Sequence, residues 1–107
     1  MTAEDMRALI ARVEVAEGAS FAMDQDIAHA IGAMGMPPKP YTASLDAAVS
    51  LVPVGHDWIL ENVNGGQTIC ARVGHNDKDR NSWGDTPALA LTAAALRARL
   101  AMGDRDE

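Results

Sequence analysis

Cysteine, aromatic side chains and positive charge are all scarce in this chain of 107 residues. Its one cysteine, Cys70, excludes an intramolecular disulfide and a zinc site built from cysteines. Because Cys70 lies within the apolar run Ile69-Cys70-Ala71, we expect a small buried side chain there rather than a nucleophile.

The charge balance excludes two kinds of partner. The chain has 9 Lys and Arg against 15 Asp and Glu, a formal net charge of -6. Affinity for nucleic acid depends on Lys and Arg that displace counterions, so we expect no nucleic-acid partner and no anionic membrane partner. The first residues lack the basic region and apolar stretch of a signal peptide, and we expect a cytoplasmic protein.

Large apolar side chains are also few. Only Phe21, Tyr41, Trp58 and Trp83 are aromatic, and 20 residues are alanine. Small side chains bury little apolar area, so we expect modest stability or help from a second subunit.

The most informative stretch that is present runs from Thr86 to Leu100. Thr86 can cap a helix, Pro87 suits the first helical position, and alanine and leucine have the highest helix propensity. A helix that is apolar nearly all round belongs in the interior. It is too short to span a bilayer before Arg97 and Arg99 end it, so we predict a buried central helix.

Three further helices are predicted before it. Apolar residues recur at helical spacing after Thr2 and again after Ser20, with Gly18 between, and predict a helical hairpin over residues 3–33. Three prolines make residues 35–40 an extended connector. A short helix follows, capped by Thr42 or Ser44.

The pattern changes to that of a β-hairpin over residues 56–73. Asn64-Gly65-Gly66 is a turn signal between two apolar strands, and Trp58 is expected in the core. A lone hairpin is marginally stable, so helices must cover it or a third strand must join it, even from another subunit. We therefore predict one α+β domain, a small antiparallel sheet sandwiched by about four helices with the C-terminal helix central. An acidic tail is expected over 103–107.

The most polar segment, residues 74–85, lies between the hairpin and the central helix. Asp77, Asp79 and Asn81 have the spacing that opens a calcium loop, but Ser82 replaces the required glycine. His75 with Asp77 and Asp79 leaves a small metal-dependent enzyme as an alternative. No nucleophile with an orienting base and no phosphate loop is present, so we expect no enzyme and no cofactor.

Trp83 stands out in this polar segment, because tryptophan there is either folded back as an anchor or presented to a partner. Acidic residues also gather in the first 35 residues and would suit a basic protein surface. The candidate partner-binding residues are Asp77, Asp79, Trp83, Glu14, Glu17, Asp24 and Asp26.

Parts of the chain resemble a known family. These parts are residues 41–48, Leu51-Val52-Pro53 with Gly55 and Trp58, and residues 86–91 with 94–98. In this order they resemble small phage and prophage proteins with an α-β-α sandwich domain. The resemblance implies helices on both faces of a small sheet and an origin in a phage or prophage, and it implies no activity or functional residues.

These observations lead to three hypotheses for function. The first is a non-enzymatic module of a phage that binds a host or phage protein in the host cytoplasm. Its sharpest form is an acidic inhibitor of a host defence complex that binds nucleic acid. The alternatives are a virion or assembly accessory protein, and the metal-dependent enzyme centred on residues 74–85. A homo-oligomer is left open.

Overall fold

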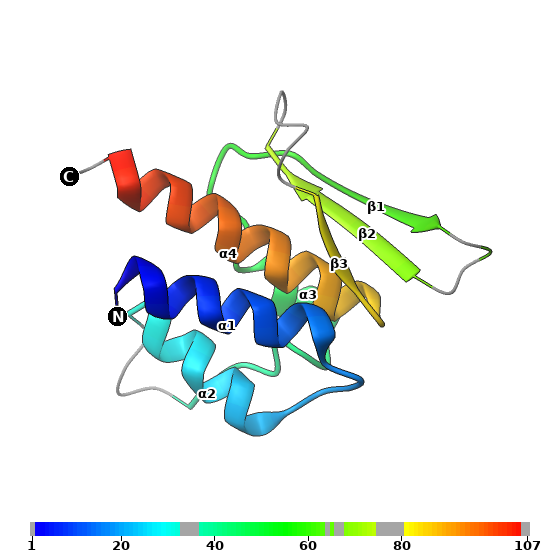
Figure 1. Cartoon of the computed structure of the whole chain (residues 1–107), viewed down its shortest axis with the longest axis horizontal. Coiled ribbons are helices and arrows are strands. Elements are labelled where there is room, and N and C mark those ends of the chain that lie inside the picture. Colours follow the sequence, from blue (N-terminus) through cyan, green and yellow to red (C-terminus); the bar gives the residue numbers. More distant parts are fainter. Residues whose placement is uncertain (1, 33–36, 64, 66–67, 75–80, 106–107) are drawn as a thin grey trace.

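A computed structural model describes residues 2–32, 37–63, 65, 68–74 and 81–105, with side chains as far as Ala101 (Figure 1). The elements in chain order are α1 (Ala3–Val15), α2 (Phe21–Ala30), α3 (Leu45–Val49), β1 (Trp58–Val63), β2 (Thr68–Val73), β3 (Ser82–Gly84) and α4 (Pro87–Arg105). The predicted α+β class, with an antiparallel sheet and a central C-terminal helix, is confirmed.

Hydroxyl side chains begin all four helices. Thr2 and Asp5 form a reciprocal capping box at α1, in which the Asp5 N–H donates to Thr2 Oγ1 at 3.1 Å. The Oγ of Ser20 and Oγ1 of Thr86 accept from the third residue beyond each, as predicted. Of the two caps left open for α3, Ser44 is the one used.

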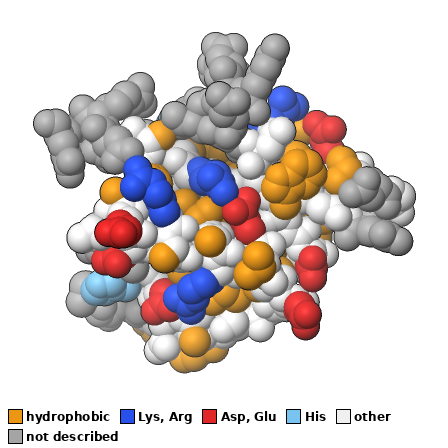
Figure 2. All heavy atoms as spheres, in the orientation of Figure 1, with side chains coloured by type: hydrophobic (Ala, Val, Ile, Leu, Met, Phe, Trp, Pro, Cys, Tyr) orange, Lys and Arg blue, Asp and Glu red, His pale blue; other side chains and the backbone are white. Residues whose placement is uncertain are grey.

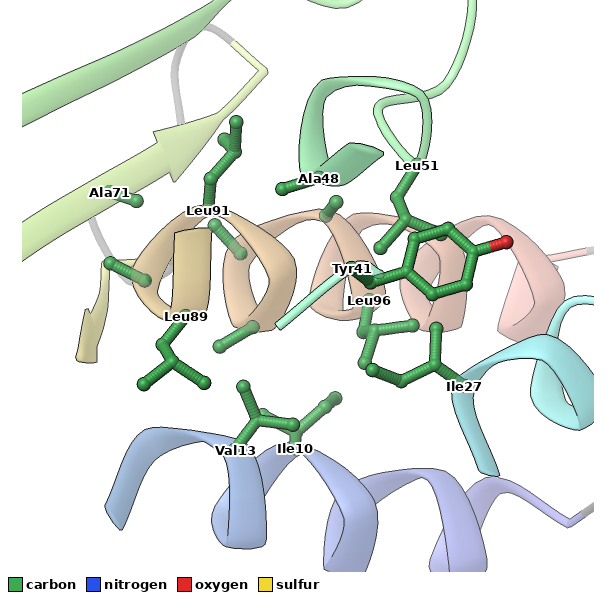
Figure 3. Close-up of a cluster of buried hydrophobic side chains, with 14 of the residues drawn as sticks. Ile10, Val13, Ile27, Tyr41, Ala48, Leu51, Ala71, Leu89, Leu91 and Leu96 are labelled. Carbon is green, nitrogen blue, oxygen red and sulfur yellow. The ribbon is translucent and has the colours of Figure 1, made fainter. Parts of the chain in front are cut away.

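α4 is the centre of the fold. It contacts α1, α3, β2 and β3, and Leu89, Leu91 and Leu96 have no exposed surface. In Figure 3, Leu89 and Leu96 point toward α1 and α2, while Leu91 points to the opposite side, toward α3 and the sheet. The alanines between these leucines are small and let neighbouring elements approach α4 closely. This explains how α4 can be covered on several sides.

The sheet has the strand order β1-β2-β3, with both pairs antiparallel. The predicted hairpin is confirmed, in a register that pairs Val63 with Thr68, while Asn64 and Gly66 lie outside the described residues. The missing third strand comes from this chain, because Ser82–Gly84 pairs with β2. The polar segment 74–85 therefore contains a strand over these three residues, which was not predicted from the sequence.

Two other expectations are corrected. Trp58 is 39 % exposed rather than in the core, because β1 is the strand farthest from α4 and contacts it least. The segment from residue 103 is not entirely a tail, because α4 continues to Arg105.

Candidate protein-binding surface

One face of the sheet packs on α4 and the other is open. The register places Leu60, Ala71 and Ser82 in one row, and Ala71 and Ser82 are completely buried beneath α4. Side chains alternate between faces along a strand, so the neighbouring rows belong to the opposite face. We call this the open sheet face, which consists of Ile59, Glu61, Val63, Thr68, Cys70, Arg72 and Trp83.

The open sheet face exposes large apolar side chains. Ile59 is 47 % exposed and Trp83 is 43 % exposed. In Figure 2, hydrophobic side chains lie bare over the strands, next to acidic and basic ones. Of the described helices, only α4 and α1 contact the sheet, and α1 does so at β3 alone. This differs from the helices on both faces that the phage resemblance implies.

The backbone of Trp83 is fixed by a hydrogen bond to α1. Its N–H donates to Glu14 Oε2 at 3.3 Å, and the other oxygen of Glu14 accepts from Arg97 Nη2 at 2.7 Å. Glu14 thus ties α1 and α4 to β3, and α1 covers an edge strand that would otherwise be free to pair. The indole is therefore exposed on a backbone that this contact fixes, and its side chain is not folded back as an anchor.

The charges on this face balance one another. Arg72 Nη2 lies 3.3 Å from Glu61 Oε1, and both side chains are exposed. Between them and Trp83 lies Cys70, which is only 8 % exposed, as the sequence predicted. Burial raises the pKa of the Cys70 thiol, Glu61 raises it further, and Arg72 opposes them, so the thiol is protonated at neutral pH.

The predicted acidic residues do not form one surface. Asp24 is 5 % exposed, because its Oδ1 accepts from both the N–H of Thr42 at 2.9 Å and the hydroxyl of Thr42 at 2.8 Å. The expectation that Asp24 faces a partner is therefore wrong, and it joins α2 to the segment before α3. Asp26 pairs with Arg12 at 2.9 Å.

Glu14 is partly buried between α1 and α4, and Glu17 is exposed in the loop after α1. The remaining two candidates, Asp77 and Asp79, lie outside the described residues together with His75.

Within the part of the chain that the structure describes, no three His, Cys, Asp or Glu side chains converge in a way that could hold a metal ion. None of the helices described has the length and apolar character needed to cross a membrane.

Sequence reasoning missed Ile59 and the strand that carries Trp83. The sequence carried no clear signal for this strand, because the serine and glycine on either side of Trp83 are more typical of turns. Gly84 has no side chain where the backbone of Ala90 approaches it, which lets β3 lie directly on α4. The exposure of Ile59 could not be predicted from the sequence, because the residue type alone does not tell which face of the sheet an isoleucine lies on.

Comparison of the chain with protein-family models, with curated proteins and with solved structures gives no match. We therefore argue function from the geometry of the described surfaces.

Proposed function

We propose that this chain is a protein-binding module that contacts its partner through the open sheet face. The observation that carries the proposal is Trp83, a large side chain 43 % exposed on a backbone fixed by Glu14. Tryptophan is enriched among residues that dominate binding energy, and a fixed backbone lowers the entropy lost on binding.

The chemistry of the open sheet face favours an apolar contact. Ile59 and Trp83 supply the apolar area, and the Glu61–Arg72 pair leaves the centre without net charge. Protein interfaces likewise combine exposed apolar side chains with polar groups that are paired. The partner surface is accordingly apolar at the point that covers Trp83.

The resemblance to phage proteins supports the finer form of the proposal. In that form the partner is a host or phage protein in the bacterial cytoplasm, and a host defence complex is the sharpest case. The net charge of -6 supports a partner with basic surface. Asp24 is buried and Asp26 pairs with Arg12, so this proposal assigns the acidic contribution to carboxylates outside α2.

The experiment is affinity capture from a bacterial lysate, followed by titration of the purified partner against variants. Trp83→Ala is expected to weaken binding by about 30-fold or more, the size of a hot-spot truncation. Val54→Ala is the control, because Val54 is fully exposed and lies outside the open sheet face. Circular dichroism must show that both variants fold.

A partner that binds Trp83→Ala and wild type equally well would refute the open sheet face as the contact. Loss of binding by Ile59→Ala, on β1 at the opposite edge of the sheet from Trp83, would support it independently.

A further inference from the structure

A second surface, separate from the open sheet face, is an apolar pocket. It lies where β3 ends and α4 begins. The pocket has a volume of about 310 Å³ and is lined by Ala19, Thr42, Ala43, Leu45, Thr86, Pro87 and Ala88. The loop before α2, the start of α3 and the start of α4 therefore meet there. This volume is at the lower end of the roughly 300–1,000 Å³ that small-molecule sites span, and it is large enough to take a whole apolar side chain.

Both polar side chains in the lining, Thr42 and Thr86, are already hydrogen-bonded. The hydroxyl of Thr42 bonds to Asp24 and to the main chain of Ser20, and Oγ1 of Thr86 accepts from the N–H of Leu89. Pro87 has no N–H to offer at the first position of α4. The lining is therefore mainly apolar, and it suits an apolar group.

The apolar surface continues beyond the pocket. Phe21 is 65 % exposed at the start of α2, two residues from Ala19, and Leu45 is 37 % exposed on the lining itself. A chain segment lying across the pocket would bury these side chains as well as fill the hollow.

Carboxylates flank the pocket on all three segments that line it. Glu17, Asp46 and Asp85 are exposed, and each lies within two residues of a lining residue. No Lys, Arg or His occurs in residues 16–21, 41–47 or 84–89. Figure 2 shows acidic side chains over the end of the molecule where α1 and β3 finish. The charged residues on the three segments that line the pocket are therefore all acidic.

We propose that this pocket binds one aliphatic or aromatic side chain of a partner protein, from a segment in which Lys or Arg flanks that side chain. The apolar lining selects the side chain, and the carboxylates select its neighbours by charge complementarity. The site shares no residue with the open sheet face, so the two contacts are independent.

The test uses blocked pentapeptides and the amide spectrum of the isotope-labelled full chain. A Lys-Lys-Leu-Lys-Lys peptide is expected to shift the amides of Ala19, Ala43 and Ala88, with a dissociation constant on the order of 1 mM. Replacing the central leucine by alanine is expected to weaken binding roughly ten-fold. A Glu-Glu-Leu-Glu-Glu peptide is expected to leave these amides unmoved at the same concentration.

Two pairs of variants test the lining and the charges. Ala43→Phe places a ring in the pocket from an exposed position and is expected to abolish the shifts, while Ala11→Phe, exposed on α1, is the matched control. Neutralising Glu17, Asp46 and Asp85 together is expected to weaken binding by about ten-fold, or about two-fold each. Glu4→Gln, at the start of α1, is expected to change nothing.

Equal binding of the Lys-flanked and Glu-flanked peptides, or unchanged binding to Ala43→Phe, would overturn the proposal. Shifts of these amides on concentrating the protein without peptide would also overturn it, because a second copy would then be the occupant. Trp83→Ala is expected to bind the peptide normally, which separates this site from the open sheet face.

Discussion

The contact between β3 and α4 gives the most demanding test of this fold. An alanine Cβ at Gly84 would lie 2.6 Å from the backbone nitrogen of Ala90 and 3.0 Å from its Cα. Both are main-chain atoms in a buried helix, so no flexible side chain can move aside. Gly84→Ala must therefore push β3 away from α4 or bend the strand.

The size of the effect follows from these distances. An ordinary contact begins near 3.4 Å, so the two elements must separate by roughly 0.8 Å. A gap of about 0.5–1 Å removes a quarter to a half of the dispersion energy of the atoms facing it. Overpacking of a core costs about 1–3 kcal/mol, and we expect the upper part of this range because the backbone must move. The midpoint of thermal unfolding should fall by roughly 8–20 °C.

The assay is urea unfolding of wild type, Gly84→Ala and Gly18→Ala, followed by circular dichroism. Gly18 is the matched control, because a Cβ there meets nothing within 4 Å. Gly18→Ala should be neutral or stabilise the protein by up to about 1 kcal/mol, through reduced entropy of the unfolded chain. If Gly84→Ala unfolds within about 0.5 kcal/mol of wild type, β3 does not lie on α4 as described.

Two further predictions concern buried polar groups. Thr92→Val removes a completely buried hydroxyl that donates to the carbonyl of Tyr41 at 3.0 Å, and should cost about 1–3 kcal/mol in urea unfolding. Thr92→Ser keeps the donor and should retain more of the stability, and the reverse order would contradict this role. Burial raises the pKa of Cys70, so the folded chain holds this proton more tightly than the unfolded chain does. Stability should therefore fall as the pH rises above about 8.5, the pKa of an unfolded thiol, and Cys70→Ala should lack this part of the decline. An identical pH dependence in both proteins would show that Cys70 contributes nothing to it.

The helices could be predicted because their signals are local. Thr2, Ser20 and Thr86 cap helices through atoms three residues away, and the sequence shows this spacing directly. The central position of α4 could be predicted because its side chains are apolar on nearly all sides of the helix, and such a helix is buried.

The surfaces could not be predicted because they depend on contacts distant in sequence. Asp24 is buried by Thr42, 18 residues later, and Glu14 meets Trp83 across 69 residues. Nothing in the local pattern distinguishes such carboxylates from solvated ones. The pocket likewise exists only where three separate segments converge.

The packing of α1 against α4 also affects how the chain is made. Leu9, Ile10 and Val13 are buried in the folded protein, yet the helix they face is synthesised about 90 residues later. Synthesis proceeds at about 5–20 residues per second, so these apolar side chains stay without their partner helix for roughly 5–18 s. A chaperone that binds short apolar segments would therefore find its target on α1 in the nascent chain, before α4 can cover it.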